Sequence, residues 1–93
     1  MIGRSGVGFV LDVQASQLST LKTRSVVPLL PEKEAPPRIK DLNPVFDIDG
    51  VLHVMLTQAI ATVPLKELGQ AVASWDDHYD DVTRALGILF TGH

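Results

Sequence analysis

The segment 74–93 (SWDDHYDDVTRALGILFTGH) carries the longest helical pattern in the chain. Its apolar side chains recur at steps of three and four residues, which places them on one stripe of an α-helix. Ser74 followed by Asp77 fits a capping pattern at the start, and Gly92 can end the helix in a left-handed conformation. Aspartates in the first two turns meet the positive end of the helix dipole. The predicted stripe consists of Trp75, Tyr79, Val82, Leu86 and Leu89.

Short strand patterns fill the part of the chain before this helix. Asp49-Gly50 between two apolar runs is a strong two-residue hairpin signal. Pro28 places its strand at an edge or a bulge, because proline has no N–H to donate. Strands are expected at 8–13, 24–30, 45–48, 51–57 and 60–63, with brief pairing at 38–42. Short strands followed by one helix indicate a small, mostly antiparallel β structure capped by that helix.

The connections between the strands are rich in proline and glycine. Residues 31–37 (PEKEAPP) are expected to form a loop, and residues 15–21 a turn or a single helical turn. Pro64 is expected to begin a helical turn that Gly69 closes. The glycine-rich residues 3–8 (GRSGVG) lack the Lys-Ser/Thr of a phosphate-binding loop, so they are expected to be a flexible entry to the first strand.

Composition narrows the class of protein. A chain of 93 residues predicts one domain, 1–93, and a domain this small gains stability from dimerisation. Both faces of the 45–57 hairpin are apolar, which also favours a homodimer. The net charge of −3 without a cluster of Lys or Arg argues against direct nucleic-acid binding. The chain has no cysteine, no signal-peptide pattern and no long apolar stretch, so we expect a cytoplasmic protein with no membrane partner.

His53 is the first candidate for chemistry. With a two-residue turn at Asp49-Gly50, it is predicted to face Phe46 across the hairpin and to share a face with Ile48, Val51 and Met55. A histidine in this position is more often a core or interface residue than a general base. No Ser-His-Asp or paired-carboxylate arrangement follows from the other spacings. Residue chemistry alone therefore predicts neither an enzyme nor a bound cofactor.

The acidic start of the C-terminal helix is the second candidate. Asp77, His78 and Asp81 could be mistaken for metal ligands, but their positions on a helix do not all face one point. We therefore expect His78 to lie on a solvated helix face and no metal site to form. His93 is terminal and is expected to be mobile unless a partner orders it.

Seven short segments occur in a fixed order from about residue 8 to the end of the chain. They are LDVQ (11–14), VVPL (26–29), NPVF (43–46), MLTQ (55–58), AIATVP (59–64), LGQAVA (68–73) and LFTG (89–92). In order and spacing they resemble the CcdB family, the toxins of plasmid and chromosomal toxin–antitoxin modules. The resemblance implies an SH3-like barrel or antiparallel sheet of the CcdB/MazF type with a C-terminal α-helix, assembled as a symmetric homodimer.

The same resemblance implies a mechanism that needs no cofactor and no bond-making by the toxin. Family toxins poison DNA gyrase: the two C-terminal tips enter the cleft of the gyrase A-subunit dimer and hold it in the open, DNA-cleaved state. A CcdA-like antitoxin wraps the toxin dimer with a disordered tail and displaces it from gyrase. The DNA-binding domain of the antitoxin then lets the complex repress its own operon. The 31–37 loop and the helix tip are the expected antitoxin-binding surfaces.

The resemblance also assigns the gyrase-contacting residues by position. They are Phe90, Thr91, Gly92 and His93, with Leu18 and Gly87 nearby. Thr91 stands where the well-known toxins have tryptophan, and His93 where they have an apolar residue. A buried tryptophan at an interface is typically worth about 2–4 kcal/mol, so weaker poisoning is expected. Family members also carry a strand before the region that begins at Gly6, which this chain is expected to lack.

Two alternatives remain open. MazF/Kid endoribonucleases use the same barrel and cut RNA with polar and basic side chains in a dimer groove, for which Arg4, Arg24 and His53 would be candidates. The acidic charge balance argues against this alternative. The other alternative is a degenerate toxin that keeps antitoxin binding and has lost poisoning, as Thr91 and His93 would suggest.

Overall fold

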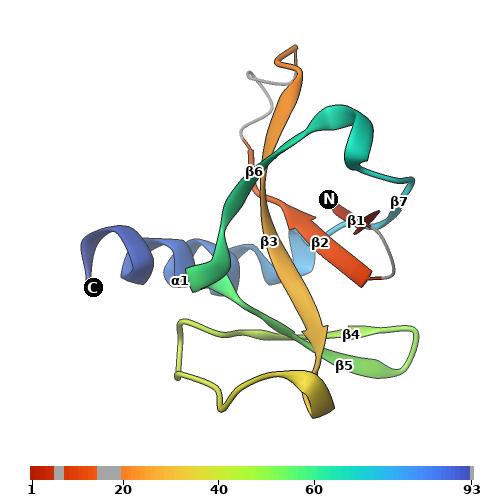
Figure 1. The fold of residues 1–93 in the computed structure, drawn as a ribbon. Helices are drawn as coiled ribbons and strands as arrows, with labels where there is room; N and C mark the ends of the chain where they lie inside the picture. The colour runs from red at the N-terminus through yellow and green to blue at the C-terminus, as the bar shows by residue number, and fades with distance from the viewer. Residues whose placement is uncertain (6–7, 15–19, 93) are drawn as a thin grey trace.

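A computed structural model describes residues 1–5, 8–14 and 20–92, which form a bent antiparallel sheet and one C-terminal helix (Figure 1). The strands are β1 (Ile2–Ser5), β2 (Gly8–Asp12), β3 (Thr23–Pro31), β4 (Val45–Ile48), β5 (Val51–Met55), β6 (Ala61–Pro64) and β7 (Ala71–Ala73). Helix α1 (Tyr79–Thr91) follows them. The predicted fold class, a mostly β SH3-like barrel or antiparallel sheet with a C-terminal helix, is confirmed, and the sheet is an antiparallel half-barrel. No helix in the described ranges is long and apolar enough to cross a membrane.

Strand β3 organises the sheet. The strand order is β4-β5-β3-β2-β1-β7, and β6 also pairs with β3. Along one side, β3 pairs with β6 through residues 23–26 and with β5 through residues 29–31, while β2 lies along its other side. Figure 1 shows β3 crossing the middle of the molecule, with the β4–β5 hairpin near one end and β6 near the other. The change of partner bends the sheet into a half-barrel.

Pro28 lies in this central strand and pairs with Val10 of β2 in an unbroken register, so the predicted edge or bulge position is wrong. The Pro28 carbonyl accepts a hydrogen bond from the Leu56 N–H at 2.9 Å. The nitrogen of Pro28 points to the same side as its carbonyl, toward the break between the end of β5 and the start of β6. A proline is tolerated there because no strand on that side needs the missing N–H.

The β4–β5 hairpin is confirmed. Asp49 and Gly50 both have positive φ, at 53° and 83°, as a two-residue turn between twisted antiparallel strands requires. The Gly50 N–H also donates to the Asp47 carboxylate at 2.8 Å. Phe46 pairs with His53 as predicted. The brief strand expected at 38–42 does not form, because these residues belong to an irregular segment that ends in a turn.

The core lies between the sheet and the first turns of α1. It consists of Ile2, Leu11, Val27, Leu29, Phe46, Ile48, Met55, Val82 and Ala85. His53 is 5% exposed and meets the ring of Phe9 edge-on at 5.3 Å, so its prediction as a core histidine is confirmed. Val51 pairs with Ile48 and shares this face of the hairpin as predicted, but it is exposed because it lies at the end of the hairpin.

Strand β1 corrects two expectations about the N-terminal region. Ile2 pairs with Leu11 of β2 and with Ala73 of β7, so residues 2–5 are part of the sheet. The described part of the glycine-rich segment is therefore not a flexible entry, and a strand does precede Gly6. The rest of that segment, residues 6–7, and most of the predicted turn at 15–21 lie outside the described residues.

Gly69 is needed for a close approach to β1. Its N–H donates to the Arg4 carbonyl at 2.8 Å, and a Cβ on Gly69 would lie 3.2 Å from that oxygen. The helical turn expected after Pro64 is a short 3₁₀ turn at Leu65–Glu67, and Leu68 caps it. Gly69 therefore lets β7 lie next to β1 and does not close the turn.

Asn43 holds the irregular segment before β4 against the sheet. Its side chain is 1% exposed, accepts from the Ile39 N–H at 2.9 Å and donates to the Met55 carbonyl at 3.0 Å and to Gln58 at 2.8 Å. Thr57 adds a hydrogen bond from its hydroxyl to the Leu42 carbonyl at 2.5 Å. These bonds join two segments that form no β ladder with each other.

Replacing Asn43 with alanine should lower the free energy of unfolding by about 2–3 kcal/mol, because the Ile39 N–H and the Met55 carbonyl lose a buried partner. Chemical denaturation measures this change. Gln58→Ala is the matched control: Gln58 is exposed and shares one of these bonds, so its loss should cost less than about 1 kcal/mol. Equal costs for the two variants would show that Asn43 does not organise the segment.

Candidate functional site

The first half of α1 is anchored to the sheet. Val82 and Ala85 are fully buried in the core, and Leu86 packs against it. Just before the helix, the Trp75 indole N–H donates to the Asp12 carbonyl at 2.9 Å. The prediction that these side chains face the core is therefore right for Trp75, Val82 and Leu86, but it missed Ala85.

The helix begins later than the sequence pattern predicts. Residues Asp76–His78 form a 3₁₀ turn, and the cap residue of α1 is His78, with no side-chain capping bond. Ser74 accepts a hydrogen bond from the Asp76 N–H at 3.1 Å next to this turn, but it caps neither the 3₁₀ turn, whose cap residue is Trp75, nor the α-helix. The shift turns Tyr79 outward, where it is 58% exposed and stacks on Trp75 at 6.1 Å. Its place on the buried stripe was predicted wrongly.

His78 is also placed differently from the prediction. Its ring lies 4.3 Å from that of the buried Phe46, so it covers part of the core and does not lie on a solvated face. Within the described ranges, no three His, Cys, Asp or Glu side chains are grouped so that they could hold a metal ion.

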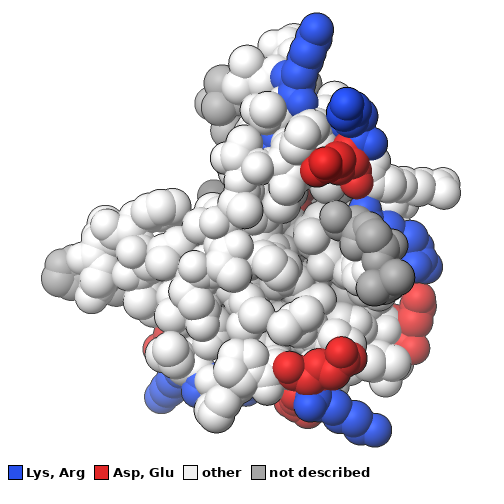
Figure 2. Space-filling view, viewed as in Figure 1, with Lys and Arg blue, Asp and Glu red and all other residues white. Residues whose placement is uncertain are grey.

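The second half of α1 extends beyond the sheet. Residues 86–89 are half-buried, and residues 90–92 are exposed. Phe90 is 69% exposed, although it is one of the largest apolar side chains in the protein. Figure 1 shows the C-terminal turns projecting past the strands, and Figure 2 shows no Lys, Arg, Asp or Glu on the projecting end. The last charged residue of the helix is Arg84. The tip, residues 87–92, is therefore an uncharged projection with an exposed aromatic ring.

Hydrogen bonds order the tip to its last described residue. The Thr91 hydroxyl donates to the Gly87 carbonyl at 2.6 Å. The Gly92 N–H donates to the Ile88 carbonyl at 2.9 Å, and Gly92 has the left-handed φ of 77° that the sequence predicted for this cap. The tip carries no titratable side chain. Its surface suits the binding of a partner through shape and apolar contact.

Four of the six predicted site residues lie together at this tip: Gly87, Phe90, Thr91 and Gly92. Leu18 and His93 fall outside the described residues, so their predicted proximity to the tip stays a prediction. Ile88 and Leu89, which lie between Gly87 and Phe90 in the sequence, are half-buried.

The residues considered for RNA cleavage occupy a different part of the molecule. The Arg4 guanidinium lies 5.0 Å above the ring of Phe9, which in turn meets His53. His53 is buried, and its Nδ1 is within hydrogen-bond distance of the Val51 carbonyl at 2.9 Å. Arg24 instead lies 3.6 Å from Asp12 and donates to two backbone carbonyls. The three residues do not form one open cluster around a substrate-sized space.

Comparison with known proteins adds to this geometry. The model of one protein family, described as CcdB protein, matches residues 2–92. One similar solved structure is described as the crystal structure of an Mtb toxin. It has a TM-score of 0.80 and 16% sequence identity, over 97% of this chain and 100% of that chain. Another is the Mycobacterium tuberculosis toxin MazF-mt6, with a TM-score of 0.78 and 16% identity over 96% of this chain and 94% of that one. At this identity the two structures show a shared fold.

Proposed function

Because the chain belongs to the CcdB family of toxins, we propose that it is the toxin of a type II toxin–antitoxin module and poisons DNA gyrase with the tip of α1. The observation that carries this proposal is the ordered, uncharged tip that exposes Phe90. An aromatic side chain held on a rigid helix can enter a cleft at low entropic cost. In this proposal the toxin is non-enzymatic, and a CcdA-like antitoxin neutralises it.

A homodimer would present two such tips to the two-fold cleft of the gyrase A subunits. One observation supports an assembly of this kind. Val51 and Leu52 of the hairpin are 51% and 44% exposed, which leaves apolar surface for a second copy. The tip itself is small, so two simultaneous contacts would raise the overall affinity above that of one.

A gyrase assay on the purified protein tests the proposal. Purified gyrase and supercoiled plasmid should accumulate protein-linked, cleaved DNA when the toxin is added, and supercoiling should be inhibited. A labelled RNA pool incubated with the same preparation should remain intact. RNA cleavage without any effect on gyrase would favour the MazF-like alternative, whose specific support is the fold shared with MazF-mt6. No effect in either assay would favour the degenerate toxin.

Thr91→Trp should strengthen gyrase binding by about tenfold or more. Tryptophan supplies the apolar area and stacking face that threonine lacks. Thr91 is exposed and loses only the hydroxyl bond to the Gly87 carbonyl, so the free energy of unfolding should change by less than about 1 kcal/mol. Surface plasmon resonance on immobilised gyrase A subunit measures the affinity. Thr91→Val, which removes the same hydroxyl without adding a ring, is the control and should not gain affinity.

A further inference from the structure

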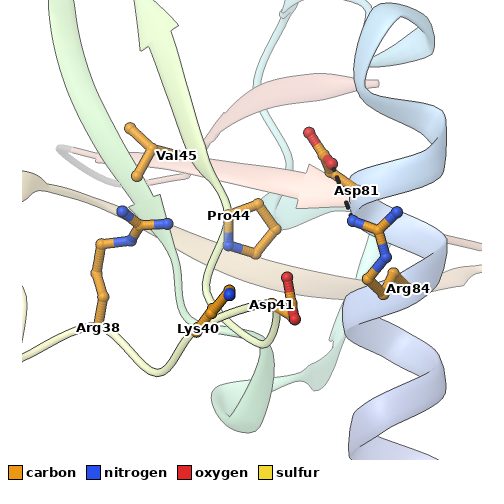
Figure 3. Close-up of a pocket in the computed structure, with 7 residues that line it drawn as sticks. All are labelled: Arg38, Lys40, Asp41, Pro44, Val45, Asp81 and Arg84. Atoms are coloured by element: carbon orange, nitrogen blue, oxygen red, sulfur yellow. Dashed lines mark hydrogen bonds and ion pairs between the residues drawn. The ribbon is translucent and has the colours of Figure 1, made fainter. Parts of the chain in front are cut away.

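A charged hollow lies beside α1, away from the tip. It has a volume of about 270 Å³ and is formed between the 38–45 segment and the first turns of α1. Figure 3 shows five charged side chains around it, with Pro44 between the two groups: Arg38, Lys40 and Asp41 come from the segment, and Asp81 and Arg84 from the helix. Neither the proposed gyrase contact nor the core uses this hollow.

The charged side chains that line the hollow have a net positive charge. Arg84 lies 3.5 Å from Asp81, so these two charges largely cancel. Among the described residues, neither Arg38 nor Lys40 forms an ion pair with a carboxylate. Of the described residues that line the hollow, Asp41 is the one further carboxylate. Three cations and two carboxylates therefore leave a net charge of about +1, which suits a single negative group.

The wall formed by the 38–45 segment is held in place before any ligand arrives. The Arg38 Nε donates to the Asn43 carbonyl at 3.0 Å, and the buried Asn43 side chain fixes the segment to β5. Asp41 has a φ of 66°, a left-handed conformation that is uncommon for a residue other than glycine. A preorganised wall lowers the entropy that a ligand would lose on binding.

The hollow and the tip share one face of α1. Arg84, Gly87, Ile88 and Thr91 are spaced at i, i+3, i+4 and i+7, so they lie on one stripe of the helix. Seven residues of helix span about 10 Å. A peptide segment anchored at Arg84 can therefore run along this stripe and cover the tip with three or four further residues.

We propose that the hollow receives one carboxylate side chain of an acidic peptide segment, and that this segment belongs to the neutralising antitoxin. The identity of the partner rests on the proposed function, whereas the carboxylate site rests on the hollow alone. Arg38 and Arg84 supply the planar donors that carboxylates prefer, and Lys40 adds a third cation. A nucleic acid suits the site less well, since Asp41 and Asp81 would repel the phosphates that flank the first one.

A neutral isostere provides the sharpest test of the carboxylate site. The probes are acetyl-glutamate-N-methylamide and acetyl-glutamine-N-methylamide, titrated into ¹⁵N-labelled protein and followed by NMR. The glutamate probe should shift the Nε–Hε signals of Arg38 and Arg84 and the amide of Asp41 with one saturable, millimolar dissociation constant. The glutamine probe should shift them at least fivefold less at equal concentration. Equal shifts with both probes, or no saturable shift with glutamate, would overturn the proposal.

Charge variants then locate the binding. Lys40→Ala combined with Arg84→Gln removes two cations and keeps the Arg38–Asn43 bond, so the glutamate probe should bind at least tenfold more weakly. Asp81→Asn raises the local charge and should tighten binding by about twofold or more. The matched control, Lys33→Ala with Lys66→Ala, removes two exposed lysines outside the hollow and should leave the affinity unchanged. If this control loses as much affinity as the Lys40→Ala, Arg84→Gln variant, the loss reflects the net charge of the protein, and the proposed carboxylate site is wrong.

Two further measurements separate this proposal from the proposed function. Inorganic phosphate that bound at least tenfold more tightly than the glutamate probe would assign the hollow to a phosphate ligand and overturn the proposal. Saturable glutamate binding in a protein that leaves gyrase unaffected would keep the carboxylate site and reject gyrase poisoning. If the protein poisons gyrase but the glutamate probe does not bind in the hollow, the carboxylate site is wrong and the proposed function stands.

Discussion

Replacing Phe90 with alanine is expected to weaken the proposed binding to gyrase by about 30- to 1000-fold. Truncating a central aromatic anchor at an interface typically costs about 2–4 kcal/mol. Phe90 is the largest exposed side chain of the tip, and the neighbouring Thr91 uses its hydroxyl within the helix. Little else at the tip could replace the lost contact. Surface plasmon resonance and the plasmid cleavage assay should both report this loss.

The other end of the helix provides the control. Tyr79 is an exposed aromatic residue of α1 at 58%, close to the 69% of Phe90, but it lies at the anchored end. Tyr79→Ala should leave gyrase affinity within about twofold of the parent. If both variants lose affinity equally, the contact does not lie at the tip. If neither does, the 31–37 loop, His93 or a different target would have to account for toxicity.

The local features of the fold could be predicted from the sequence because their causes are local. Asp49-Gly50 can adopt two successive positive φ values, and that turn sets the pairing of Phe46 with His53. Gly92 ends α1 because it too can adopt a positive φ. The positions of these features depend on a few neighbouring residues, which the sequence shows directly.

The start of α1 depends on contacts that are distant in the sequence. Ser74 and the following aspartates have the pattern of a helix start, yet Trp75 bonds to Asp12 and the ring of His78 packs on Phe46. Both contacts favour a 3₁₀ turn before the helix, because the chain must bring two large rings against the sheet. No spacing within 74–81 indicates them.

The position of Pro28 and the charged hollow also depend on contacts between residues that are distant in the sequence. Proline usually marks an edge strand, but β3 changes partner at this point, which only the tertiary pairing reveals. The hollow is lined by Arg38 and Lys40 and also by Arg84, which lies about 45 positions further along the sequence. The residues of the tip could be named because a resemblance to a known family supplied them. The hollow matches no such motif.

Phe46→Ala should cause the largest loss of stability, lowering the free energy of unfolding by about 3–5 kcal/mol. Its side chain is 1% exposed and joins the hairpin to the residues before α1 through His53 and His78. Total stabilities of small domains are about 5–15 kcal/mol, so this one side chain accounts for a large fraction of the total. Chemical denaturation followed by circular dichroism measures the change.

Phe90→Ala is the matched control for this loss, because it removes the same side chain from an exposed position. Its free energy of unfolding should stay within about 0.5 kcal/mol of that of the parent protein. Phe46→Leu, which keeps most of the buried volume, should recover more than half of the stability lost with alanine. A Phe46→Ala protein that unfolds at the parent's denaturant concentration would mean that the hairpin does not pack beneath α1. Since the tip is held out from the sheet by that packing, the proposed gyrase contact would lose its structural basis as well.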